Sequence, residues 1–88
     1  MHDDITERVL RVIAEAQRLP AGSVKPENTF SELQIDSLDG IQIVFALEEE
    51  FNINIPDDAA RQFSSVQEAV EGVRHLVEQK AAEGAGKS

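Results

Sequence analysis

Residues 36–51 read DSLDGIQIVFALEEEF, and this stretch decides the fold. Asp and Ser both favour the start of a helix, and the apolar residues that follow recur at helical spacing. We therefore predict a helix that begins at Asp36 or Ser37 and ends at about Phe51. Its apolar residues cover well over half of the helical circumference, whereas a core-facing stripe needs only about 100°. The excess either packs a central helix against all its neighbours or serves an apolar ligand or a partner.

The polar sector of this helix is acidic, since it holds Asp39, Gln42, Glu49 and Glu50. Acidity extends over the whole window 26–60, which contains nine of the 17 acidic residues and no Lys or Arg. The rest of the chain is balanced, so the net charge of −9 lies in this window. Because mixed charges would keep a domain in solution equally well, a single-sign face indicates a surface that steers basic partners.

The composition excludes several classes of protein. An acidic chain with four Phe and no Trp or Tyr lacks the groups that bind nucleic acid, and anionic membrane surfaces would repel it. The longest apolar run, residues 43–47, is too short for membrane insertion. The chain has no Cys, so we expect no disulfide and no thiol of its own. We expect a cytoplasmic protein, in which any thiol chemistry arrives on a cofactor.

Outward from this helix, the sequence predicts an all-α fold: a small bundle of three main helices plus one short helix. A long loop at 21–35, pinned to the core by Phe30, Leu33 and Ile35, joins the first two main helices. We expect residues 1–80 to form a single domain and the small, polar residues 81–88 to form a disordered C-terminal tail. The other helices are expected at about 4–19, 57–63 and 65–80, the first opened by Asp4 and the last by the capping box Ser65–Glu68.

Ser37 stands at the predicted start of the helix. Helix capping is the ordinary role of a serine in this place. The positive end of the helix macrodipole also favours a phosphate group, by about 0.3–1 kcal/mol when exposed. The neighbouring Asp36 and Asp39 oppose that effect in part. Position alone leaves both roles open.

The sequence resembles the acyl carrier proteins of dissociated fatty-acid synthesis. The match runs from Asp36-Ser37-Leu38-Asp39 through Ala46-Leu47-Glu48-Glu49-Glu50-Phe51 to Ile55-Pro56-Asp57, and more loosely over residues 5–80. The resemblance implies a covalent 4′-phosphopantetheine arm on Ser37, whose thiol holds acyl chains as thioesters. It also implies a monomeric carrier that is not an enzyme. Its expected partners are a phosphopantetheinyl transferase and acyltransferases, ketosynthases or related lipid-pathway enzymes.

The resemblance also implies two surfaces. Basic patches of partner enzymes would dock on the second helix, and the acyl chain would fold back between the second helix and the short third one. The docking residues would be Asp36, Leu38, Asp39, Ile41, Gln42, Phe45, Glu48 and Glu49. The residues lining the acyl cavity would be Ile41, Val44, Phe45, Ile55 and Phe63.

Several positions depart from the pattern of the family. Gln42 replaces a usual glutamate, Gln34 replaces a usual glycine, and Gly40 replaces a bulkier residue. Phe45 and Phe63 are larger than the usual aliphatic residues and would reshape the cavity. These changes keep the carrier role and make a specialised lipid, polyketide or surface-glycolipid pathway as compatible with the sequence as fatty-acid synthesis.

Other functions fit the sequence less well. A calcium-binding loop at Asp36–Gly40 lacks the required acids at its third and twelfth positions, and a serine hydrolase would need a G-x-S-x-G turn. A peptidyl carrier usually has glycine where Asp36 stands. The alternative from another class is an acidic helical adaptor that docks basic partners without a prosthetic group. It accounts for the charge but not for the wide apolar arc or the serine motif.

Overall fold

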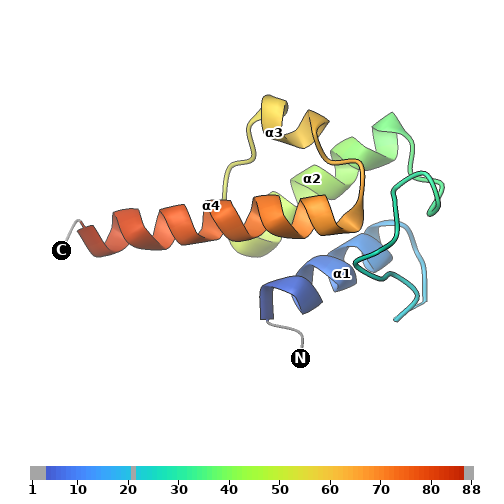
Figure 1. Cartoon of the computed structure of the whole chain (residues 1–88), viewed down its shortest axis with the longest axis horizontal. Coiled ribbons are helices and arrows are strands. Elements are labelled where there is room, and N and C mark those ends of the chain that lie inside the picture. The colour runs from blue at the N-terminus through green and yellow to red at the C-terminus, as the bar shows by residue number, and fades with distance from the viewer. Residues whose placement is uncertain (1–3, 21, 87–88) are drawn as a thin grey trace.

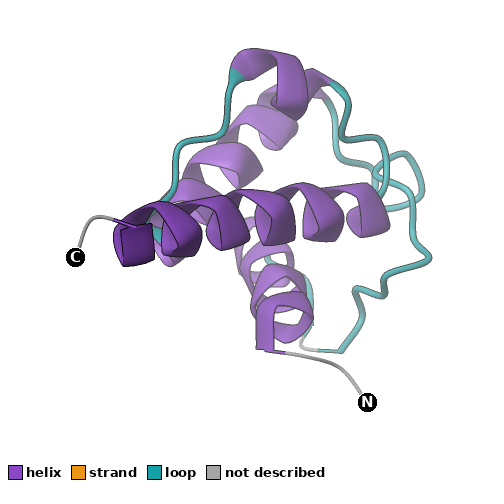
Figure 2. Ribbon diagram, turned by 60° about the vertical axis from the view of Figure 1, so that its left-hand side comes forward, coloured by secondary structure: helices purple, strands orange, loops and turns teal. Residues whose placement is uncertain are grey.

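The computed structural model describes residues 4–20 and 22–86, and in these ranges the chain forms four helices. They are α1 (Asp4–Ala16), α2 (Ser37–Phe51), α3 (Asp57–Arg61) and α4 (Val66–Gly86). Figures 1 and 2 show the long loop between α1 and α2, and α3 held above α4 on two connecting segments. The predicted all-α bundle of three main helices and one short helix is confirmed.

The core lies where α1 packs against both α2 and α4. Its fully buried side chains come from the apolar stripes of these three helices. From α2, only the side of the helix that carries Ile43 and Leu47 is fully buried, at 1% and 0% exposed. The largest of the fully buried side chains are Ile13, Ile43, Leu47, Val9, Val66, Val70 and Val73.

The long loop is tied to the core and to the start of α4. Val24 and Ile35 are buried, whereas Phe30 and Leu33 are half-buried. Backbone hydrogen bonds join Phe30 N–H to the Ser64 carbonyl (3.1 Å) and Val66 N–H to the Asn28 carbonyl (3.0 Å). The loop therefore holds the residues that lead into α2 in a fixed position.

Helix ends follow local backbone geometry. α2 begins and ends as predicted. Asp36 caps its start, and Asn52, which follows its last residue, ends it by adopting the left-handed conformation at φ 54°. α1 ends at Ala16, before the predicted Leu19. Arg18 adopts the left-handed backbone conformation, and Leu19 N–H donates to the Ala14 carbonyl, which closes the end of the helix. α3 ends at Arg61 instead of the predicted Phe63, because the chain tightens there: Gln62 N–H and Phe63 N–H bond to the carbonyls three residues before them.

The predicted end of the last helix near Lys80 was wrong. α4 continues to Gly86, since the segment after Lys80 contains Ala and Glu, which favour helix, and no proline to end it. In Figure 1 this end of α4 projects beyond the other helices, and residues 78–82 are exposed. Residues 87 and 88 of the predicted disordered tail lie outside the described residues. Disorder of 81–88 in solution, and the domain limits at 1–80, stay predictions.

Gly40 can be replaced by alanine without a clash. It lies inside α2, and a Cβ added there would meet no atom within 4 Å. We therefore expect Gly40→Ala to raise the free energy of unfolding by about 1 kcal/mol, because glycine costs that much in a helix interior. Urea unfolding of both proteins measures the change, and a lower stability would contradict the open space around this position.

Candidate functional site

Ser37 is the first residue of α2, and its side chain is exposed. The capping role falls to its neighbour, since Asp36 Oδ1 accepts a hydrogen bond from Asp39 N–H at 2.9 Å. Within residues 4–20 and 22–86, the Ser37 hydroxyl makes no hydrogen bond. The structure thus resolves the ambiguity at the start of α2: the cap is Asp36, and the serine hydroxyl is available for chemistry.

Three large apolar side chains lie exposed on α2. Leu38 is 71% exposed, Ile41 is 51% exposed and Phe45 is 60% exposed. They lie on the side of the helix opposite the buried Ile43 and Leu47. The apolar excess of α2 therefore does not pack into the core. It forms a surface strip that starts beside Ser37.

Polar and acidic side chains flank this apolar strip. Asp36, Gln42 and Glu49 are exposed, and Asp39 is half-exposed. The structure therefore places these four predicted docking residues on the same outer part of α2 as the strip.

Glu48, the remaining one of the eight predicted docking residues, has a structural partner. Its Oε2 accepts a hydrogen bond from Ile55 N–H at 2.7 Å, and its side chain is only half-exposed. This bond ties the segment before α3 to the end of α2. Glu48 therefore positions the connection that carries α3, a role that its place in the sequence did not reveal.

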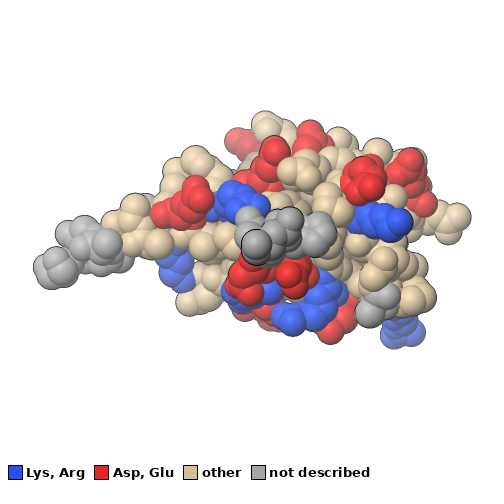
Figure 3. All heavy atoms as spheres, turned by 60° about the horizontal axis from the view of Figure 1, so that its bottom comes forward, with Lys and Arg blue, Asp and Glu red and all other residues tan. Residues whose placement is uncertain are grey.

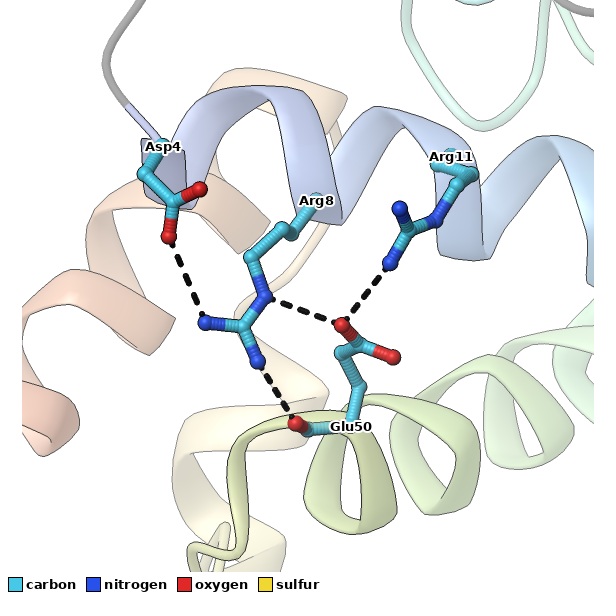
Figure 4. A network of polar contacts seen from close by, with 4 residues as sticks. All are labelled: Asp4, Arg8, Arg11 and Glu50. Atoms are coloured by element: carbon cyan, nitrogen blue, oxygen red, sulfur yellow. Dashed lines mark hydrogen bonds and ion pairs between the residues drawn. The ribbon is translucent and has the colours of Figure 1, made fainter.

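Glu50 belongs to the contact between α1 and α2 and not to the acidic face. Its Oε2 lies 2.9 Å from Arg8 Nε and 2.9 Å from Arg11 Nη2, and its carbonyl accepts from Arg8 Nη2 at 2.8 Å (Figure 4). The Arg8 guanidinium also lies 4.3 Å from the centre of the Phe51 ring. Figure 3 shows a face of the molecule on which acidic and basic side chains intermingle. The hydrogen bond from Arg8 holds the pKa of the Glu50 carboxyl below its usual value.

Acidification is expected to remove the contribution of Glu50 to stability. A carboxyl whose pKa is lower in the folded chain stabilises fully above its ordinary value of 4.5, and the effect disappears as the pH falls through the lower folded value. Glu50→Gln should therefore be less stable than the wild type at neutral pH and equally stable in acid. Urea unfolding of both proteins over this range measures the difference. A difference that persists in acid would assign the effect to packing.

A cavity of about 630 Å³ opens between α2 and α3, with Ser37 among its lining residues. Four of the five predicted lining residues surround it: Ile41, Val44, Phe45 and Phe63. Ile55 does not line it, because its side chain points into the core and is 4% exposed. The remaining lining residues are Gly40, Asp57, Ala60 and Arg61.

Sequence reasoning missed these four lining residues for different reasons. Asp57, Ala60 and Arg61 share one side of a short helix, a helical spacing that could have been read from the sequence. Gly40 lies four residues before Val44, on the same side of α2, but it has no side chain that would mark it as a wall of the cavity. Arg61 brings a positive charge and Asp57 a negative charge to the lining of this cavity.

Within the described part of the chain, no helix is both long and apolar enough to cross a membrane. In the same residues, no group of three His, Cys, Asp or Glu side chains is arranged to hold a metal ion.

All residues of this site lie in the part of the chain that matches known proteins. A family model described as "Phosphopantetheine attachment site" matches residues 7–73. An acyl carrier protein from a Picosynechococcus species is 44% identical over 71 residues, which cover 80% of this chain and 88% of that relative. The crystal structure of an acyl carrier protein from Thermotoga maritima is similar with a TM-score of 0.75 and 26% identity. That similarity covers 90% of this chain and 98% of the crystallised one.

Proposed function

The chain belongs to the acyl carrier protein family, and from that premise we propose that the Ser37 hydroxyl is the attachment point of its 4′-phosphopantetheine arm. One observation carries this assignment. The hydroxyl is exposed and unbonded within the described residues, at the start of α2, because Asp36 performs the capping. A serine needed for the cap would instead have its oxygen engaged by the backbone.

The surroundings of Ser37 fit the arm. A phosphodiester on this hydroxyl would lie near the positive end of the α2 macrodipole, with Arg61 lining the same cavity. When bound, the group supplies the thiol that a chain without Cys lacks. The role of the chain is to hold the arm at a surface where it can reach both the solvent and the cavity.

We assign the cavity between α2 and α3 to the acyl chain. Ile41, Val44, Phe45 and Phe63 supply apolar walls, and Ser37 lies at its border. Burial of an acyl chain there is favourable by about 0.8 kcal/mol for each methylene group. Polar lining residues such as Asp57 and Arg61 lie on the α3 side. An acyl group could therefore be withdrawn from water between visits to partner enzymes.

The exposed apolar strip Leu38–Ile41–Phe45 with its flanking acids suits enzymes that present an apolar patch ringed by basic residues. Acyl carrier proteins work with a phosphopantetheinyl transferase and with biosynthetic enzymes. Acyltransferases and ketosynthases of a fatty-acid or specialised lipid pathway are the partners we propose. In this role the protein is a substrate and shuttle, monomeric and cytoplasmic, and does not itself catalyse a reaction.

The deciding experiment is co-expression with a phosphopantetheinyl transferase. The intact mass should increase by one arm, and fragmentation should locate the added mass on Ser37. A mass that stays unchanged with several transferases of broad specificity would reject the attachment site. It would favour the adaptor function, which the charge segregation in residues 26–60 also supports.

A further inference from the structure

Gly72 of α4 accommodates the ring of Phe63. A Cβ at position 72 would lie 2.7 Å from both Cε1 and Cζ of Phe63, closer than nonbonded carbon atoms approach. The missing side chain of Gly72 is therefore the space that the outer edge of the ring occupies. Phe63 is half-buried and also lines the cavity between α2 and α3. One ring thus separates this cavity from the backbone of α4.

We propose that Gly72 and Phe63 form a pair that sets the depth of the cavity and so selects the length of the acyl chain. This inference rests on the proposed function of the cavity. Phe63 closes the cavity toward α4, and Gly72 lets the ring lie withdrawn against the helix. Phe63 is thereby a specificity-determining residue, and Gly72 is the positioning residue that acts through it.

The pair can be varied without rebuilding the fold. The atoms that an alanine at position 72 would strike belong to the outer end of a side chain, which moves more easily than backbone. The ring must then leave α4, and the space available to it is the cavity. Phe63→Leu has the opposite effect, because it removes Cε1 and Cζ and leaves room above Gly72.

The experiment uses the full chain loaded with a series of straight saturated acyl groups, from butyryl to palmitoyl. A transferase of broad specificity transfers each acyl-phosphopantetheine unit from the corresponding coenzyme A thioester, and intact mass verifies the loading. The thermal midpoint of each loaded protein is compared with that of the unacylated form. The chain length that gives the largest rise in midpoint reports the depth of the cavity, without any enzymatic activity. Each methylene that the cavity no longer accepts weakens chain burial roughly fourfold.

We expect Gly72→Ala to move the optimum to shorter chains and Phe63→Leu to longer ones. The double variant should return toward the wild-type optimum, because the added methyl group fills part of the space that the shorter leucine leaves above position 72. A proton NMR spectrum adds a second measurement. The chemical shift of the terminal methyl of the best-fitting chain should contain a ring-current contribution from Phe63, and Phe63→Leu should remove that contribution.

An optimum that stays the same in both single variants, with loading intact, overturns the pair while leaving the carrier function in place. A wild-type chain that takes no arm overturns the carrier function and this inference with it. Gly40→Ala is the matched control for stability, since it adds the same methyl group to a helix where it meets no atom within 4 Å. Gly72→Ala should therefore stabilise the unloaded protein less than Gly40→Ala does.

Discussion

A Ser37→Ala variant is expected to take no arm at all while unfolding at the same urea concentration as the wild type. The covalent bond needs the hydroxyl oxygen, so removal of that oxygen leaves no site for the transferase. Stability should stay within about 0.5 kcal/mol, because the side chain is exposed and makes no hydrogen bond among the described residues. Intact mass after co-expression and a urea titration measure the two quantities.

Asp36→Ala is the matched control for this prediction. Its side chain caps α2 through Asp39 N–H, so its loss should lower the free energy of unfolding by about 1 kcal/mol. The hydroxyl of Ser37 remains in this variant, and prolonged incubation with the transferase should still add the arm. The assignment fails if Ser37→Ala gains the mass of an arm. The division of roles fails if Ser37→Ala loses as much stability as Asp36→Ala.

The parts of the fold that were predicted correctly depend on local signals. α2 begins and ends as expected because Asp36 bonds to a backbone group three residues away and Asn52 turns the chain at the other end. The buried stripes of α1 and α4 follow directly from the spacing of their apolar residues. The same spacing showed that α2 carries more apolar surface than its core contact needs. The structure added that this surface is exposed, at Leu38, Ile41 and Phe45.

Other features that sequence reasoning missed depend on contacts that no local pattern encodes. Glu48, Glu49 and Glu50 are chemically alike and consecutive, yet they have three different roles. Glu48 bonds to Ile55 N–H, Glu50 pairs with Arg8 and Arg11, and Glu49 is exposed. The contact of α2 with α1 and its contact with the segment before α3 separate these roles. The contact between Gly72 and Phe63 has the same character, since neither residue signals the other along the chain.

These three roles allow a sharp test of electrostatic steering. Asp39→Lys combined with Glu49→Lys is expected to slow association with the transferase by about 10- to 1,000-fold at low salt, because steering by a charged face accelerates association by that range. The two positions lie beside the apolar strip and outside the Glu50 ion pairs. The rate of arm attachment, measured by mass at limiting enzyme over a range of salt concentrations, reports the effect.

Glu71→Lys with Glu78→Lys provides the control, because it makes the same change in net charge at exposed positions of α4. If the face of α2 steers its partners, this control should stay close to the wild-type rate. The α2 variant should also lose the salt dependence of the wild type, since screening acts only on the attraction that the substitutions remove. Equal slowing of both variants would show that net charge alone matters. Unchanged rates at low salt would show that the apolar strip suffices for docking, and the nine acids of residues 26–60 would then need another explanation.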